Sequence, residues 1–300
     1  MVSIGAAKNR FFKDPNYELR ITFYILRFTF YVLRFTFYVL RFTPYPPPMH
    51  LLEIQALCDL GQRQLMEMQY LAAESTLARA ECAAWEFRDF DTLARLYMPL
   101  QEARRQRRQR CGEGTVRLDL LAVGADDLLD PDELLTASTC GQWLIAGWGS
   151  IAPAVRLRAL QSERGLYVDT FLAAVYPMAG GRRVVVIVPT VDVALPPSRG
   201  QSIDALLAEL PPHSIVMHED ELPKGTRAGT YETYGEVMAI WERMHRPFLT
   251  AADMQADPIR KIEHYRRAIQ VDYACELAHQ KLADVAKDLA RDYTATRLHG

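Results

Sequence analysis

The stretch of this 300-residue chain whose residue types and spacing best suit binding chemistry runs from residue 142 to residue 169. Its order predicts a strand, a tight turn, a helix and a second strand, with Gly147, Gly149 and Ser150 in the turn. Glycines let the backbone turn tightly and approach a phosphate group, and the N-terminus of the helix supplies N–H donors. The turn is therefore a candidate phosphate site, although such glycines also serve simply to connect a strand to a helix.

Polar residues at other predicted strand ends are further candidates, because ligands of open α/β sheets bind at the carboxyl ends of the strands. On this chain those ends hold Ser150, Asp192, His218 and Glu219. His213 precedes His218 by five residues, at the other end of the same predicted strand. The two imidazoles would then be roughly 16 Å apart, too far to share one metal ion. His218 with Glu219 is either a ligand site or a solvated strand end.

The segment from Gly147 to Ala152 matches the pattern G-x-G-x-x-G/A and resembles the phosphate-binding turn of Rossmann dinucleotide-binding domains. Asp169 lies 20 residues after Gly149, close to the position at which that fingerprint has a ribose-binding carboxylate. The resemblance implies a nucleotide or another phosphorylated ligand held by Gly147, Gly149, Ser150 and Asp169. It leaves the identity of the cofactor open.

Catalytic and metal-binding patterns are missing from the sequence. There is no evident nucleophile–base pair, metal-ligand cluster or P-loop lysine, and Ser150 lacks the G-x-S-x-G context of a hydrolase nucleophile. The five cysteines are scattered without C-x-x-C spacing, which favours free thiols in a reducing, cytoplasmic compartment over disulfides or a metal site. They are Cys58, Cys82, Cys111, Cys140 and Cys275.

The composition is that of a globular protein of one or two domains, with 49% hydrophobic and 24% charged residues. The net charge of −2 conceals an asymmetry, because residues 1–48 hold seven basic and two acidic residues. The rest of the chain is therefore mildly acidic, which argues against a nucleic-acid partner.

Residues 20–43 repeat a heptad of the type RFTFYVL almost without change. A membrane helix of this segment would carry Arg27 and Arg34, each costing about 2.5–3.5 kcal/mol near the bilayer centre. A strand would turn each repeat to the opposite face, and a helix would be apolar nearly all round. We interpret residues 1–48 as translated low-complexity repeat, disordered if present, and expect the working chain to begin at Met49.

Residues 49–112 are predicted to be helical, because apolar residues recur at helical spacing with few breakers. Pro99 is expected to kink or interrupt the second part of this region. A basic cluster near its end is either a patch for an acidic partner or a set of cations that complements the helix C-terminus. The cluster consists of Arg104, Arg105, Arg107, Arg108 and Arg110.

Residues 113–226 alternate predicted strands with helices, which favours a mostly parallel sheet. Residues 182–189 form a continuous β-branched run typical of a strand buried on both faces. Asp130 and Pro131 provide the N-cap and first residue of a helix. We predict an α/β fold in which a small, mostly parallel sheet carries helices on both faces and is flanked by helical hairpins.

Residues 227–300 are predicted to be helical, with a first helix that ends before Pro247. The segments 264–272 and 275–290 resemble the second and next first helices of tetratricopeptide repeats, with Tyr265 at a large packing position and a Leu-Ala pair from Leu282. The resemblance implies a helical surface that binds another protein.

Two functions follow from these patterns. The first is a non-catalytic interaction or scaffold protein whose tetratricopeptide-like helices bind a protein partner, while its α/β region binds at most a small phosphorylated ligand. The alternative is an enzyme that uses a nucleotide or sugar phosphate at the Gly147–Ser150 turn. The first is favoured because no catalytic arrangement is evident, and neither nucleic acid nor a membrane is expected as a partner.

Overall fold

A computed structural model describes residues 51–299, with side chains to Asp292. The predictions for residues 1–48 and for a start at Met49 lie outside this part of the chain. Within it, no helix combines the length and apolar character needed to cross a membrane.

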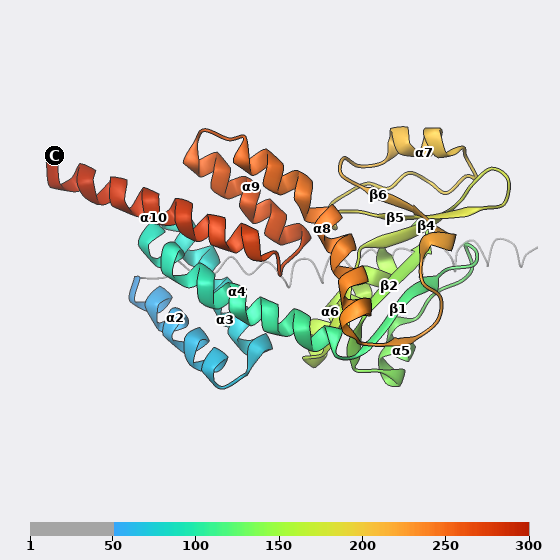
Figure 1. Cartoon of the computed structure of the whole chain (residues 1–300), viewed down its shortest axis with the longest axis horizontal. Helices are drawn as coiled ribbons and strands as arrows, with labels where there is room; N and C mark the ends of the chain where they lie inside the picture. Colours follow the sequence, from blue (N-terminus) through green and yellow to red (C-terminus); the bar gives the residue numbers. More distant parts are fainter. Residues whose placement is uncertain (1–50, 300) are drawn as a thin grey trace, which may run out of the picture. The chain divides into compact units, whose positions relative to one another are not determined.

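The described chain contains two groups of helices separated by an α/β region (Figure 1). The first group is α2 (Leu51–Met66), α3 (Tyr70–Glu86) and α4 (Phe90–Gly112). The α/β region comprises β1 (Thr115–Leu121), α5 (Pro131–Ala137), β2 (Cys140–Trp148), α6 (Ala152–Arg164), β3 (Tyr167–Thr170), β4 (Ala173–Pro177), β5 (Arg183–Ile187), α7 (Ile203–Glu209), β6 (Ile215–His218), the 3₁₀ helix η1 (Glu219–Glu221) and β7 (Arg227–Ala228). The second group is α8 (Tyr231–Asp253), α9 (Pro258–Val271) and α10 (Glu276–His299).

Side-chain caps fix where several helices begin. The Asp130 carboxylate accepts the N–H of Asp132 at 2.9 Å, and Pro131 is the first residue of α5. Asp257 caps α9 in the same way by accepting the N–H of Ile259 at 2.9 Å. Each cap satisfies an N–H group that has no partner within the helix.

Two prolines do not end their helices. The predicted end of the first C-terminal helix before Pro247 is wrong, because α8 continues through Pro247, and α4 likewise continues through Pro99, which excludes an interruption there. An internal proline costs about 3 kcal/mol. Buried side chains on both sides of each proline offset this cost, as Leu96 and Leu100 do on α4.

The sheet has the order β6-β5-β4-β2-β1-β7, and β3 also pairs with β2. The pairs that β2 makes with β1, β3 and β4 are parallel, whereas β4–β5, β5–β6 and β1–β7 are antiparallel. The α/β class is confirmed, and the sheet is mixed, with parallel pairing at its centre and antiparallel pairing towards both edges. Strands β3 and β4 follow β2 in one register and are separated only by Phe171 and Leu172.

Helices cover both faces of the sheet, as predicted. Successive residues of β2 alternate between two hydrophobic clusters: Leu144 packs with Trp241 of α8, and Ile145 packs with Leu157 of α6. Strand β5, the predicted doubly buried strand, is buried from Val184 to Ile187.

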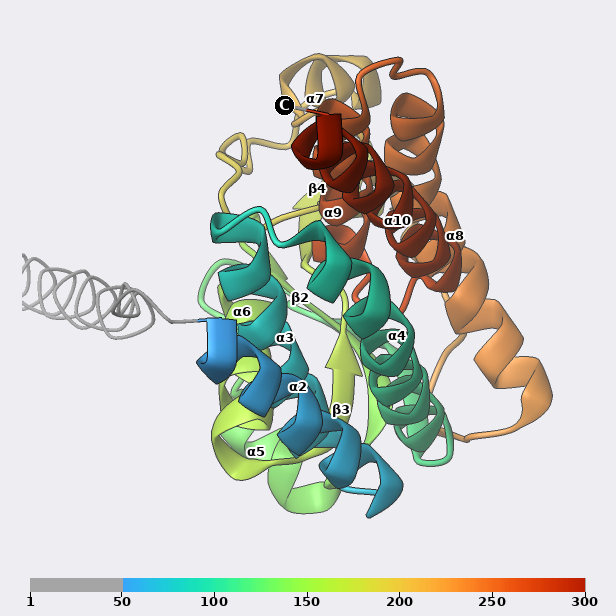
Figure 2. The same ribbon diagram turned by 90° about the vertical axis from the view of Figure 1, so that its left-hand side faces the viewer.

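The two helical groups meet although 118 residues separate Gly112, the end of α4, from Tyr231, the start of α8. Helix α10 packs antiparallel along α4, α9 packs on α10, and α8 packs on α9 (Figures 1 and 2). The order of neighbours is therefore α2-α3-α4-α10-α9-α8, and the α/β region is an insertion between α4 and α8.

Candidate functional site

A buried group of charged side chains is centred on Arg108, whose exposed fraction is 1%. Its Nε lies 2.9 Å from the Asp169 carboxylate, and its terminal nitrogen lies 2.8 Å from the Asp272 carboxylate. The guanidinium also lies over the Trp241 ring at 4.4 Å and the Tyr273 ring at 4.6 Å. Two carboxylates and two aromatic faces thus surround one buried cation.

These partners come from all three regions of the described chain. Arg108 belongs to α4, Asp169 to β3 and Trp241 to α8, while Asp272 and Tyr273 lie in the connection between α9 and α10. The Arg108 network therefore joins the helical groups and the sheet at one point.

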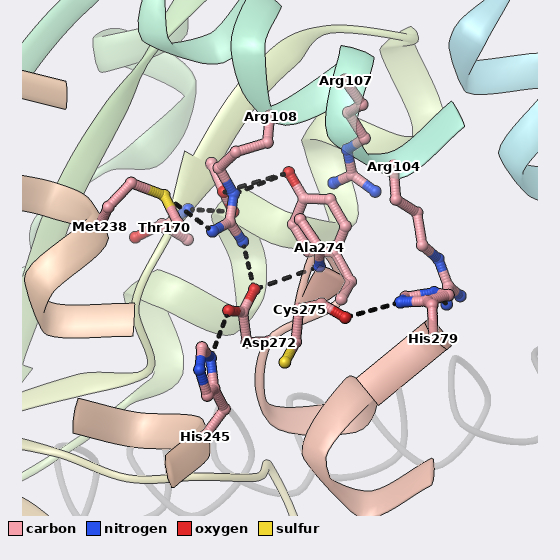
Figure 3. A network of polar contacts seen from close by, with 12 residues as sticks. Arg104, Arg107, Arg108, Thr170, Met238, His245, Asp272, Ala274, Cys275 and His279 are labelled. Carbon is pink, nitrogen blue, oxygen red and sulfur yellow. Dashed lines mark hydrogen bonds and ion pairs between the residues drawn. The ribbon is translucent and has the colours of Figure 1, made fainter. Parts of the chain in front are cut away.

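The predicted basic cluster divides into two kinds of arginine. Arg105 and Arg110 form local ion pairs with Glu102 at 2.8 Å and Glu113 at 3.0 Å. Arg104, Arg107 and Arg108 instead point into the protein (Figure 3). The inward set does not serve as a simple complement to the helix C-terminus, because it pairs with carboxylates of other elements.

Glu74 of α3 holds the two other inward arginines. Its carboxylate lies 2.7 Å from Arg107 and 3.3 Å from Arg104. Burial alone would raise the pKa of Glu74, but the attraction and hydrogen bonds of these two arginines outweigh burial and lower it. Glu74 is therefore ionised at neutral pH.

His279 of α10 is buried and neutral. Its Nδ1 lies 2.8 Å from the carbonyl oxygen of Cys275, and its Nε2 lies 3.0 Å from an Arg104 nitrogen. A carbonyl only accepts, so Nδ1 carries the proton and Nε2 accepts from Arg104. Burial first and the Arg104 charge second lower the pKa of His279 to about 3.

Three potential metal-binding or proton-transfer groups meet beside Arg108: His245, Asp272 and Cys275. One ligand atom from each lies within 4.8 Å of the others. His245 Nδ1 is 2.7 Å from Asp272 Oδ2. Burial opposes the charge on His245, yet hydrogen bonds from its ring to Asp272 and Cys275 raise its pKa to about 9. An imidazolium, a carboxylate and a thiol thus share one interior position (Figure 3).

Three N–H groups of the predicted phosphate-binding turn donate within the protein. The N–H groups of Gly149, Ser150 and Ala152 donate to protein acceptors, and Pro153 has no N–H group. Gly149 has a φ of +57°, and a Cβ atom there would approach the Cβ of Ser198 to 3.0 Å. The glycine is thus required by the turn and by the segment that covers it. A phosphate at this turn would have to displace existing hydrogen bonds.

Asp169 is not brought to that turn. It pairs in register with Gln142, whereas Gly147 pairs with Ala174. Because β2 and its neighbours run in parallel, Asp169 lies five residues from the turn along the strands, roughly 16 Å. The ribose-binding role implied by the Rossmann resemblance requires the two to be adjacent, and the carboxylate instead pairs with Arg108.

The other strand-end candidates divide between two edges of the sheet. Strand β6 runs in the same direction as β2, so His218 and Glu219, at the end of β6, lie at the same edge of the sheet as Ser150. Glu219 forms an ion pair with Arg183 at 2.6 Å. Asp192 follows β5, which runs the opposite way, and it is exposed beyond the opposite edge. Asp192 follows the carboxyl end of its strand, as predicted, but the antiparallel direction of β5 separates it from Ser150, His218 and Glu219.

Sequence reasoning did not predict the Arg108 network or the His245–Asp272–Cys275 group. One signal was present for Arg108. It lies at the helical spacing of the buried residues Leu93, Tyr97, Leu100 and Cys111, so a charge occupies a core position of α4.

Comparison with protein-family models, with curated proteins and with solved structures finds no match to this chain.

Proposed function

We propose that this chain is a non-catalytic interaction protein whose helices α2–α4 and α8–α10 form one tetratricopeptide-like array that binds a protein partner. The observation that carries the proposal is the packing of α10 on α4, which unites the two helical groups. A repeat array needs about three helical hairpins to bury a continuous core. Neither group of three helices has three helical pairs alone, whereas the six helices together form three, the middle pair being α4 with α10.

Polar contacts across the junction support a fixed array. Arg266 of α9 forms an ion pair with Glu81 of α3 at 2.8 Å, and Arg104 contacts His279 across α4 and α10 at 3.0 Å. A rigid array presents its outer surface in one geometry, which lowers the entropy cost of binding a partner.

Exposed apolar side chains on the array supply possible contact points. Met98 of α4 is 50% exposed and Leu277 of α10 is 48% exposed. These two helices form the junction of the array. Apolar side chains on a rigid surface are typical of binding interfaces, where methionine is enriched.

The test compares binding by the unsubstituted chain, by a double variant of the array and by a control variant of the α/β region. We expect Met98→Glu with Leu277→Glu to abolish recovery of specific protein partners in quantitative affinity purification, with no change in folding. Leu207→Glu on α7 is the matched control, because Leu207 is 51% exposed in the α/β region. Recovery of the same partners with all variants, or of none with the unsubstituted chain, would contradict the proposal.

A further inference from the structure

We propose that His245, Asp272 and Cys275 form a binding site for one divalent transition-metal ion of the zinc type. The three residues come from two elements, since His245 lies on α8 and the other two lie in the connection between α9 and α10. One nitrogen, one carboxylate oxygen and one sulfur lie within 4.8 Å of one another. This site is independent of the interaction surface proposed above.

The chemistry of the three ligands selects the class of ion. Magnesium and calcium prefer sites made only of oxygen atoms. Thiolate and imidazole ligands favour zinc and related ions, and three protein ligands leave one position for water or another group. A mixed sulfur, nitrogen and oxygen set therefore indicates a zinc-type ion.

The connection that carries Asp272 and Cys275 is held in place before any ion binds. The Asp272 Oδ1 atom accepts from Arg108 at 2.8 Å and from the N–H of Ala274 at 3.1 Å. The N–H of Cys275 donates to the Asp272 carbonyl at 3.0 Å. Hydrogen bonds of this kind orient metal ligands and tune their affinity. They leave Asp272 Oδ2 directed towards His245.

An ion would replace two protons, one released from the His245 imidazolium and one from the Cys275 thiol, and a small movement would adapt the group to it. Two ligands at about 2.0 Å from a tetrahedral zinc ion are roughly 3.3 Å apart. His245 Nδ1 and Asp272 Oδ2 are 2.7 Å apart. The imidazole must therefore retreat by several tenths of an ångström. The His245 side chain is 12% exposed, whereas Asp272 is fully buried, so His245 is the ligand with room to move.

Metal uptake is tested on the full chain without an affinity tag. We expect one zinc ion per chain after equilibrium dialysis. With cobalt in place of zinc, we expect a thiolate-to-cobalt charge-transfer absorption band. Cys275→Ser and His245→Gln should each weaken binding by more than the roughly 10-fold to 100-fold that loss of an outer hydrogen-bond partner costs. Cys58→Ser is the matched control, because Cys58 is also buried but belongs to α2.

Three results would overturn the proposal: no bound metal in the folded chain, equal binding by Cys275→Ser and Cys58→Ser, or a cobalt complex without the thiolate band. Asp272 is not substituted in this test, because its loss also removes one of the two carboxylates that pair with the buried Arg108. Circular dichroism of the His245→Gln and Cys275→Ser variants separates loss of the site from loss of the fold.

Discussion

The Gly147–Ser150 turn and the Arg108 network use polar groups in opposite ways. The turn resembles a ligand site in sequence, yet the N–H groups of Gly149, Ser150 and Ala152 donate to the neighbouring backbone and to the Ser150 hydroxyl. The network carries no sequence motif, yet it brings buried charges from α4, β3 and the α9–α10 connection together. Local patterns therefore describe how the backbone turns, whereas the concentration of charge depends on which distant segments meet.

The largest expected effect is on the network. Arg108→Ala leaves Asp169 and Asp272 buried without their cation, and we expect the free energy of unfolding to fall by about 3–5 kcal/mol. Urea denaturation measures the change. Arg105→Ala is the control, since that side chain is 43% exposed and pairs only with Glu102, and its loss should cost at most about 1 kcal/mol. A similar fall in the free energy of unfolding in both variants would show that the Arg108 network contributes no more to stability than the surface ion pair of Arg105.

The next effect is on the pH dependence of stability, measured with a chelator present. The pKa of His245 is raised to about 9 from 6.5, so the stability it contributes is complete below pH 6.5 and is lost between pH 6.5 and 9. The pKa of His279 is lowered to about 3 from 6.5, so the folded state loses stability as the pH falls below 6.5. We expect stability to be greatest near pH 6.5, with a fall on each side of about 2–4 kcal/mol.

Single variants separate the two limbs of this profile. His245→Gln should flatten the alkaline limb and leave the acid limb in place. A profile of His245→Gln that still falls by the same amount between pH 6.5 and 9 would show that another group causes the alkaline loss.

A smaller effect is expected at the turn. Gly149→Ala places a Cβ atom at a φ of +57° and 3.0 Å from Ser198, which should cost about 1–2 kcal/mol. Thermal unfolding measures the loss. Gly124→Ala is the matched control, because no atom lies within 4 Å of its Cβ position. Equal stability of the two variants would mean that the segment around Ser198 moves away from the added Cβ atom at no cost in free energy.

The smallest effect is expected from phosphorylated ligands. A ligand at 100 times its dissociation constant adds about 2.7 kcal/mol to stability. Because three N–H groups of the turn already donate within the protein, we expect nucleotides and sugar phosphates to raise the free energy of unfolding by less than about 1 kcal/mol. A full shift that Gly149→Ala abolishes would restore the turn as a ligand site and reverse the comparison.

The fold could be predicted from the sequence where its causes are local. Caps such as Asp130 with Pro131 identify helix starts, and β-branched runs such as residues 183–187 identify buried strands. The continuation of α4 through Pro99 was not predictable, because its compensation comes from packing partners that the local sequence does not specify.

The candidate site was less predictable than the fold. Asp272 and Cys275 are three residues apart, but His245 lies 27 residues before Asp272 and Arg108 lies 164 residues before it. Their meeting depends on α10 packing on α4. The direction of β5 was not predictable either, because a buried strand has the same sequence pattern in both directions, and that direction decides at which edge of the sheet Asp192 lies.

The insertion of the α/β region also bears on the order in which the protein forms during synthesis. The N–H of Gly229 bonds to the carbonyl of Gly114 at 2.7 Å, so the region leaves and rejoins the helices at nearly one point. Helices α2–α4 emerge from the ribosome long before α10, their neighbour in the array. Until then the α4 surface lacks its cover, and Arg108 lacks Asp272. Completion of the array is thus a late, long-range step, of the kind that slows folding and exposes apolar surface to chaperones.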